Sequence, residues 1–332
     1  MQISPRDAEI AITDLSLQGE GIGRLADNAV VFVAGALPGE VVRVRLRQQR
    51  RQHWSADLVA VVEPAAQRRR PPCILADHCG GCSLQPLDDS AQALWKQRHV
   101  EQTLQRLGQL QATIRPILRS ARSLGYRNRA VIPLERTPEG MLRAGYYRRG
   151  SHRIVNLNHC PVLDPRLDGL IVALKDDLEA TGWPVDRHGA GGLRHLALRV
   201  GAGSGELLIT LIGRAMDDLP GAAELAQGWM DRWPALVGVT LNLQPQPDNR
   251  LFGERSHTLC GRPWLQEAFA GLTIRIGSDS FFQVSTVQAE AVLPLLEEAL
   301  GPARGTLIDA YCGLGTYSLP LARLGWKVEG IE

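Results

Sequence analysis

The chain has 332 residues, of which 44% are hydrophobic and 22% are charged, and its formal net charge is +2. This composition is typical of a soluble globular protein of two or three domains. The N-terminus lacks the pattern of a signal peptide, and no apolar run reaches the roughly 18 residues of a membrane span, so we expect a cytoplasmic protein with no membrane partner.

Residues 1–63 predict an all-β domain, because short apolar runs alternate with turn signals such as "LQGEGIG" and "LPGE". In "VRVRLR" apolar and basic residues alternate, and a period of two places them on opposite faces of one strand. Strands at this spacing favour a small closed barrel, whose basic face either binds an oligonucleotide or simply keeps the surface solvated. The apolar face holds Val42, Val44 and Leu46, and the basic face holds Arg43, Arg45 and Arg47.

Three cysteines follow a predicted linker at residues 65–72, in the loop "CILADHCGGC" (Cys73, Cys79 and Cys82). A disulfide is disfavoured because cytoplasmic thiols stay reduced, and six cysteines are too few for a disulfide scaffold. A bound metal ion or cluster is the better interpretation. Zinc remains an alternative, although the spacing differs from the paired C-x-x-C knuckles of many structural zinc sites.

Residues 88–108 predict a helix that Asp89 or Ser90 caps and that Gly108 ends. Residues 110–270 predict a mixed α/β region, in which "LRHLALRV" and "GELLITLIG" pair as a hairpin. The predicted apolar stripe of the helix consists of Leu94, Val100, Leu104 and Leu107.

The segment from Arg115 to Arg153 is strongly basic, with ten arginines against two acids and with tyrosines among them. Guanidinium groups suit phosphate oxygens, and aromatic rings can stack on unpaired bases. The segment therefore suits RNA binding, and a solvated basic surface is the alternative.

From residue 272 the pattern changes to alternating strands and helices. "LTIRIG" predicts a strand, and the helix that follows has capping-box spacing at Ser285 and Gln288 and should break near Pro294. The stretch "TLIDAYCGLGTYSLPLARLGWKVEGIE" then predicts a strand, a glycine turn, a helix to about Leu324 and a second strand.

This strand–turn–helix unit has the pattern of a nucleotide-type site. Gly313 and Gly315 allow the backbone to approach a ligand, and Glu332, 19 residues past Gly313, can accept hydrogen bonds from ribose hydroxyls. Ser318 stands where the dinucleotide fingerprint has its third glycine, which disfavours NAD or FAD and favours S-adenosylmethionine. A tight turn without a ligand is the alternative.

Together these motifs identify a family. The chain resembles the RNA uridine-5-methyltransferases that carry a TRAM barrel and a [4Fe–4S] cluster, most closely those that act on 23S rRNA. The resemblance runs in order through "CILADHCGGC", "GYRNRA", "GYYRRGSHRIVNLNHCPVL", "SFFQVS" and "DAYCGLGTYSLPLA". In this family a cysteine thiolate adds to carbon 6 of uracil, carbon 5 takes the methyl group, and a carboxylate removes the proton from carbon 5.

The resemblance implies a ligand set for each cofactor. The [4Fe–4S] cluster would be held by Cys73, Cys79, Cys82 and Cys160. The cofactor S-adenosylmethionine would contact Gln283, Tyr311, Thr316 and Glu332, beside the glycine turn of Gly313 and Gly315. Thr316 departs from the family, which has an asparagine there. From the basic segments and the resemblance, the predicted RNA-binding residues are Arg43, Arg45, Arg47, Arg127, Arg129, Arg148 and Arg149.

The predicted fold is multidomain: an all-β, OB-like TRAM barrel at 1–64, a central α+β iron–sulfur domain at 65–271, and at 272–332 the start of an α/β Rossmann-like class I methyltransferase domain. The family's nucleophile and base would lie beyond Glu332, so we expect no catalytic residue in this chain. Cys312 would belong to the donor turn, and Cys260 would be a partly buried residue. On this interpretation the chain is C-terminally truncated and inactive.

The expected partner is RNA, specifically 23S rRNA, bound by a monomer. A tRNA uridine-5-methyltransferase and a non-catalytic, RNA-binding iron–sulfur fragment are the alternatives. A radical methylthiotransferase is disfavoured, because such enzymes need a C-x-x-x-C-x-x-C loop, and the first gap here is longer.

Overall fold

The computed structural model describes residues 7–185, 191–246 and 248–332, which form two compact units. The barrel unit contains the described residues up to Arg119 together with a short later stretch, Tyr147–Ser151, here called the clasp segment. The sheet unit contains Ser120–Tyr146 and His152–Glu332. The chain therefore passes between the units three times, a division that differs from the three predicted domains. No helix in the described part of the chain has the length and apolarity that crossing a membrane requires.

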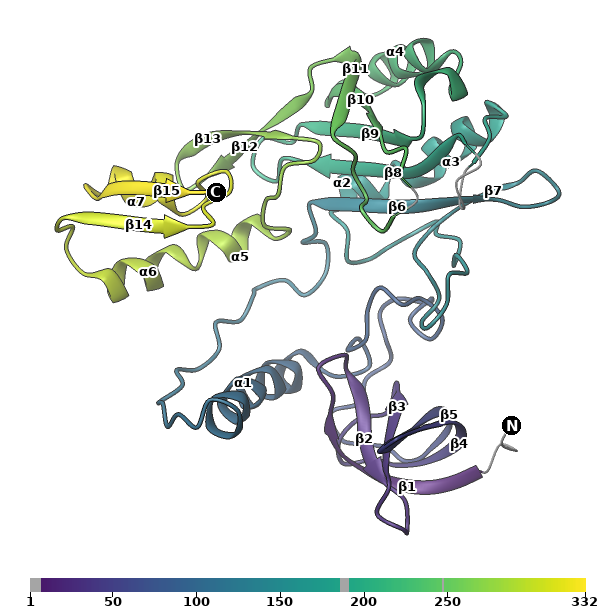
Figure 1. Cartoon of the computed structure of the whole chain (residues 1–332), viewed down its shortest axis with the longest axis vertical. Helices are drawn as coiled ribbons and strands as arrows, with labels where there is room; N and C mark the ends of the chain where they lie inside the picture. The colour runs from purple at the N-terminus through teal and green to yellow at the C-terminus, as the bar shows by residue number, and fades with distance from the viewer. Residues whose placement is uncertain (1–6, 186–190, 247) are drawn as a thin grey trace. The chain divides into compact units, whose positions relative to one another are not determined.

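The barrel unit begins with a closed five-stranded barrel in the order β1-β2-β3-β5-β4, which confirms the predicted barrel (Figure 1). The side chains of Val42 and Val44 are completely buried in its core, whereas the arginines between them point outward, as the period-two alternation predicts. The strands are β1 (Asp7–Leu15), β2 (Glu20–Arg24), β3 (Val30–Ala34), β4 (Val41–Arg50) and β5 (His53–Glu63).

Residues 65–72 have no helix or strand, as expected of a linker, but they are fixed to the barrel. Arg68 forms an ion pair with Glu40, whose side chain is fully buried, and it also donates to the carbonyl of Gly35 at 2.7 Å. Arg69 donates to Asp89 at 2.7 Å, at the start of the following helix. A buried carboxylate that lost its arginine would be strongly destabilising, so this segment is part of the fold.

Helix α1 (Asp89–Arg106) is capped by Asp88 rather than by the predicted Asp89 or Ser90, because the Asp88 side chain accepts the backbone N–H of Ala91 at 2.8 Å. The predicted apolar stripe is not its packing face: Leu94 is 67% exposed and Leu107 is 82% exposed. Instead, α1 packs through Ala91 and Trp95. Their partners are the buried side chains of Leu15, Leu37 and Leu87.

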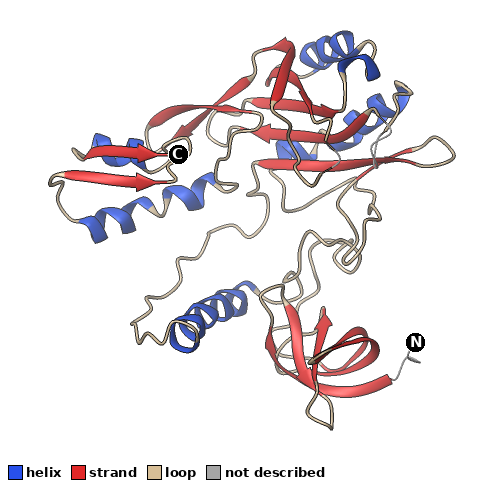
Figure 2. Ribbon diagram, in the orientation of Figure 1, coloured by secondary structure: helices blue, strands red, loops and turns tan. Residues whose placement is uncertain are grey.

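The sheet unit is built on a six-stranded sheet in the order β11-β10-β9-β8-β6-β7 (Figures 1 and 2). Strands β9 and β10 are parallel, with α4 (Ala222–Arg232) between them in the chain, and the other neighbours are antiparallel. The predicted hairpin is present as β8 and β9. The strands are β6 (Arg129–Arg136), β7 (Leu142–Ala144), β8 (Leu193–Val200), β9 (Leu207–Gly213), β10 (Leu236–Leu243) and β11 (Arg255–Gly261).

Short helices and a hairpin complete this part of the unit. Helix α4 packs on β10 and β11, α3 packs on β7, and α2 packs on β8. The hairpin of β12 and β13 turns at Ala270 and Gly271, both of which have positive φ. The bounds are α2 (Pro165–Asp168), α3 (Ile171–Ala180), the 3₁₀ turn Met216–Asp218, β12 (Trp264–Phe269) and β13 (Leu272–Gly277).

The C-terminal part has the predicted order of elements, and Pro294 marks the predicted break between two helices. The predicted capping box does not form, because Ser285 makes no side-chain capping hydrogen bond. Strands β14 and β15 pair in parallel, with α7 as the crossover. The bounds are α5 (Thr286–Glu290), α6 (Leu293–Leu300), β14 (Thr306–Ala310), α7 (Ser318–Arg323) and β15 (Lys327–Ile331).

Candidate functional site

The glycine turn, residues 311–317, follows β14 and carries three backbone conformations of positive φ. These are at Tyr311 (65°), Gly313 (54°) and Gly315 (75°). Glycine adopts this conformation freely, but a tyrosine does so at a cost of about 1 kcal/mol. The Tyr311 side chain is 92% exposed, so core packing does not explain the strain. A strained residue with an exposed ring beside a glycine turn is typical of a ligand-binding loop.

Glu332 lies at this turn because β14 and β15 are parallel neighbours. Their carboxyl ends meet at one edge, and the N–H groups of Tyr311 and Cys312 donate to the carbonyl of Ile331 at 2.7 and 3.1 Å. The N–H of Gly313 donates to Glu332 Oε2 at 2.7 Å. The structure therefore brings together three of the predicted site residues, Tyr311, Gly313 and Glu332.

Ser318 has a definite role in place of the third fingerprint glycine. Its hydroxyl donates to Asp309 Oδ2 at 2.5 Å, which ties the end of β14 to the first residue of α7. The side chain is buried, so this hydrogen bond also satisfies its polar group. Thr316 lies half-buried between these two features.

Gln283 lies in the segment that joins β13 to α5, and Asn128 braces this segment. The Asn128 side-chain N–H group donates to the carbonyl of Gln283 at 2.9 Å and to the hydroxyl of Thr286 at 3.0 Å. The backbone N–H of Asn128 donates to the carbonyl of Val284 at 2.9 Å. The neighbouring Phe282 is in the core cluster against which Leu314 and Tyr317 of the glycine turn pack.

Two arginines on adjacent strands hold the start of the same segment. Arg129 and Arg199 are register partners in β6 and β8, and both donate to the carbonyl of Ser280, Arg199 at 2.6 Å. Burial and the nearby charge of Arg129 lower the pKa of Arg199 to about 9. Sequence reasoning placed Arg129 on the RNA and missed Asn128 and Arg199. Asn128 and Arg129 both lie in "GYRNRA", but nothing in the sequence pattern singled out Arg199.

The four predicted cluster ligands are divided between the two units. Cys73, Cys79 and Cys82 lie in the barrel unit, whereas Cys160 lies in the sheet unit. Among the described residues there is no group of three or more His, Cys, Asp or Glu side chains that could hold a metal ion. The described structure therefore gives no support to an iron–sulfur domain, the four cysteine ligands stay a prediction, and no step of the chemistry is assigned to such a cluster.

Hydrogen bonds between the cysteine loop (residues 73–82) and the clasp segment are found where the cluster was expected. The N–H of Gly80 donates to the carbonyl of Tyr147 at 2.8 Å, and Cys79 and Arg148 form an isolated antiparallel bridge. Arg149 donates to the carbonyl of Cys82 at 3.0 Å. A Cβ atom at Gly80 would lie 2.8 Å from the Tyr147 oxygen, so only glycine fits this approach.

The predicted basic face of the barrel is largely neutralised by acids on neighbouring strands. Arg43 pairs with Glu9 at 2.7 Å, and Arg45 pairs with Asp7 at 2.9 Å. The hydrogen bond from Arg45 lowers the pKa of Asp7, which keeps that carboxylate charged. Arg47 pairs with Asp57 in the same way. Sequence alternation placed these arginines correctly but could not show their partners.

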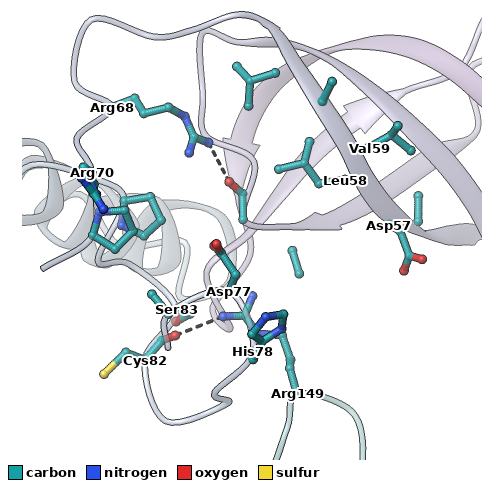
Figure 3. Close-up of a pocket in the computed structure, with 18 of the residues that line it drawn as sticks. Asp57, Leu58, Val59, Arg68, Arg70, Asp77, His78, Cys82, Ser83 and Arg149 are labelled. Carbon is teal, nitrogen blue, oxygen red and sulfur yellow. Dashed lines mark hydrogen bonds between the residues drawn. The ribbon is translucent and has the colours of Figure 1, made fainter. Parts of the chain in front are cut away.

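The remaining predicted RNA-binding arginines differ in exposure. Arg127 is exposed and donates to the carbonyl of Arg129 at 3.1 Å. Arg129 is half-buried over the ring of Phe252. Arg148 and Arg149 are exposed and line a cavity of about 890 Å³ in the barrel unit, between β5 and the cysteine loop. Figure 3 shows Arg149 beside His78, with Arg68 and Arg70 also at this cavity.

Comparison with known proteins identifies the barrel and shows a solved structure of the same fold. The model of the TRAM domain matches residues 7–59, which are the barrel. A solved tRNA (uracil-54, C5)-methyltransferase of Pyrococcus abyssi, in complex with S-adenosyl-L-homocysteine, has the same fold with a TM-score of 0.73 at 21% identity. That match covers 97% of this chain and 72% of the archaeal one. The fold is thus that of a TRAM-domain methyltransferase.

Sequence relatives show the family. An uncharacterized RNA methyltransferase of Parasynechococcus marenigrum is 46% identical over 328 residues, which cover 98% of this chain and 70% of the relative. Another, from Nostoc sp., is 45% identical and is matched over 98% of this chain and 71% of the relative. The chain belongs to this family of RNA methyltransferases and is an enzyme of that class.

These matches correct the predicted fold class. The relatives align with 98% of the chain, so the central region is part of a methyltransferase rather than a separate iron–sulfur domain. The prediction of a truncated, inactive chain is not supported by this match, which covers 98% of this chain and 70% of the relative.

Proposed function

We propose that the protein transfers a methyl group from S-adenosylmethionine to carbon 5 of a uridine in RNA, with 23S rRNA as the substrate. The observation that carries the proposal is the glycine turn, in which Gly313 holds the carboxylate of Glu332 beside the exposed Tyr311. A uridine of tRNA is the alternative substrate, and the archaeal protein of the same fold is named for that reaction.

The residues at the turn fit the proposed donor. Glu332 Oε2 accepts the N–H of Gly313, and among the described residues nothing donates to its second oxygen, which is left for a ribose hydroxyl. Ser318 stands where the dinucleotide fingerprint has its third glycine, so the turn does not match the pattern of a pyrophosphate site. Gln283, Tyr311, Thr316 and Glu332 are the proposed contacts.

Bound S-adenosylmethionine would supply an electrophilic methyl group on its sulfonium. The chain's own residues bind and orient: Glu332 fixes the ribose end, and Asn128 holds the backbone of Gln283 at the other side of the same core. Uracil carbon 5 is a poor nucleophile, so the reaction needs a thiolate at carbon 6 and a base for the carbon 5 proton.

We assign no described cysteine as the nucleophile that adds to carbon 6. A Cβ atom at Gly330 would lie 2.7 Å from the sulfur of Cys312, which shows that Cys312 packs against β15. The thiol of Cys260 donates to Gln227 at 3.0 Å. The prediction that nucleophile and base follow Glu332 in the chain stays a prediction.

The proposed division of labour follows the chain. In this proposal residues 1–64 contact RNA. Residues 65–271 also contact RNA and brace the segment that contains Gln283, and residues 272–332 bind S-adenosylmethionine. Arg148 and Arg149 are the predicted RNA-binding residues best placed for contact, because they are exposed and have no carboxylate partner among the described residues. We propose that the protein acts as a monomer in the cytoplasm, where its RNA substrate is found.

Loss of the gene tests the proposal. Nucleoside analysis of rRNA and tRNA from a deletion strain should show one 5-methyluridine missing from 23S rRNA, and re-expression should restore it. Loss of a tRNA 5-methyluridine would select the alternative substrate. Loss of a different methylated nucleoside would refute uridine carbon 5 as the target.

A further inference from the structure

The cavity between β5 and the cysteine loop has an excess of positive charge. Among the described residues, six arginines and two aspartates line it. Three of the arginines are paired with carboxylates, namely Arg47 with Asp57, Arg68 with Glu40 and Arg69 with Asp89. The other three are Arg70, Arg148 and Arg149.

Among the described residues these three arginines have no carboxylate partner. Arg149 donates to a neutral acceptor, the carbonyl of Cys82, and in the described part of the chain no hydrogen bond or ion pair engages the guanidinium of Arg70 or Arg148. One lining carboxylate, Asp77, is likewise exposed and unpaired. The cavity therefore keeps a net positive charge after internal pairing, which is the condition for binding an anion.

The clasp segment delivers two of these charges. Its backbone pairs with the cysteine loop at Gly80 and Cys79, and this places Arg148 and Arg149 on one wall of the cavity. Arg70 precedes the cysteine loop in the chain and lies in the segment that the ion pairs of Arg68 and Arg69 hold in place. Figure 3 shows Arg70 and Arg149 as parts of the same cavity lining. The arginines are thus held on fixed backbone.

We propose that this cavity binds backbone phosphates of the RNA substrate, through Arg70, Arg148 and Arg149. The inference rests on the proposed RNA substrate and adds where the barrel unit contacts it. The outward arginines Arg43 and Arg45 are not the contact, because their charges are already balanced by Glu9 and Asp7. An arginine already balanced by a carboxylate neutralises little phosphate charge, so binding there would release few of the counterions condensed on the RNA.

The lining also indicates which part of the RNA is bound. Among the described lining residues, His78 alone carries an aromatic ring. Apart from the charged side chains, the rest of the lining consists of aliphatic, proline or small residues, including Leu58, Val59 and Pro71. Base stacking needs aromatic faces, whereas guanidinium groups suit phosphate oxygens. A cavity of about 890 Å³ is large enough for a nucleotide-sized group. We therefore expect positioning contacts that do not depend on base sequence.

The test measures RNA affinity against salt concentration for the full chain and two double variants. Arg70→Ala with Arg148→Ala removes two free cavity charges, and Arg43→Ala with Arg45→Ala is the matched control on the same unit. Short oligo(U) and oligo(A) are the probes. The slope of log K against log salt should fall in magnitude by about 1 to 2 for the cavity variant, equally for both probes, because each lost phosphate contact removes about 0.7 from a single-strand slope.

The control should change the slope by much less, and Asp77→Asn should strengthen binding of both probes. Equal losses in the two double variants, or a loss confined to one base sequence, would overturn the proposal. Both variants are checked for an unchanged thermal unfolding midpoint; if the cavity variant is unstable, Arg70→Gln with Arg148→Gln replaces it. S-adenosylmethionine binding is measured in parallel, since its absence would refute the proposed function and leave the phosphate site standing.

Discussion

The backbone N–H of Gly313 donates to Oε2 of Glu332 with 2.7 Å between the two atoms, although 19 residues separate them in the chain. The contact exists because β14 and β15 are parallel, so the turn after one strand meets the residue after the other. The carboxylate is therefore oriented before any ligand arrives. Such preorganisation lowers the entropy that binding has to overcome.

Glu332→Gln should weaken binding of S-adenosylmethionine about tenfold or more, because a hydrogen bond to a charged group contributes about 1.5–3 kcal/mol. Isothermal titration calorimetry measures the change. The matched control is Glu329→Gln on the same strand, an exposed side chain whose ion pair with Lys327 spans 3.7 Å. Equal effects of the two substitutions would show that Glu332 acts only through overall charge.

Gly313→Ala should destabilise the protein by about 1 kcal/mol through backbone strain alone. Its φ is 54°, and a Cβ atom there would meet nothing within 4 Å, so crowding is not involved. Gly228→Ala in α4 is the control, because that position is helical and equally open. The control should stabilise by about 0.5–1 kcal/mol. Urea unfolding of both variants gives the comparison, and destabilisation by both would contradict this explanation.

Asn128→Ala should destabilise the protein by about 1–3 kcal/mol and weaken donor binding, since it leaves the acceptors at Gln283 and Thr286 unpaired. Asn128→Asp separates shape from hydrogen bonding. It keeps the shape but loses the N–H donor, and the Oδ1 atom of Asn128 has no partner in the described structure. Asp should therefore be as damaging as Ala in calorimetry and unfolding. A fully active Asp variant would remove Asn128 from the account.

The elements that followed from the sequence are those with a local cause. The strand at "VRVRLR" follows from a period-two pattern, and the break before α6 follows from Pro294, because proline is tolerated in the first turn of a helix but not in its interior. The glycine turn and its acid were also predictable, because residue spacing and strand order suffice to bring Gly313 and Glu332 together.

What the sequence could not show depends on register and on contacts between distant segments. Arg43 meets Glu9 only because of how β4 pairs with β1. Helix α1 packs through Trp95 rather than through its leucines, since the face that the barrel offers decides the packing. Asn128 reaches Gln283 across 155 residues. The cysteine spacing suggested a cluster, whereas backbone hydrogen bonds from the clasp segment hold the described loop.

His195 gives the protein a specific pH dependence of stability. Burial, together with the nearby charge of Arg194, lowers the pKa of its imidazole to about 4. Between pH 4 and 6.5 the unfolded chain binds a proton at this histidine that the folded chain does not bind. The stability that the neutral His195 contributes is therefore fully present above about pH 6.5 and is lost as pH falls towards 4. We predict up to about 3 kcal/mol less stability across this range.

His195→Asn should flatten that part of the stability profile, as measured by urea unfolding at several pH values. Carboxylates titrate in the same range, so the difference between the two proteins isolates the histidine. An unchanged profile would contradict the assignment.

Gly80→Ala should detach the clasp segment from the cysteine loop, because the new Cβ atom would lie 2.8 Å from the carbonyl oxygen of Tyr147. Hydrogen exchange should rise at Gly80 and at Ser151, whose N–H donates to Arg148 at 3.0 Å. Exchange in the barrel strands should not change. If the amide at position 80 were as protected in the variant as in the unaltered protein, the hydrogen bond to Tyr147 would not require glycine at this position.

Calorimetric titration of the full chain with S-adenosylmethionine, and separately with NAD, distinguishes a methyl-donor site from a dinucleotide site. The glycine turn with Ser318 and Glu332 predicts saturable one-to-one binding of S-adenosylmethionine, weakened by Glu332→Gln, and no binding of NAD. A folded protein that bound NAD as well, or that gave no heat with S-adenosylmethionine, would contradict the account.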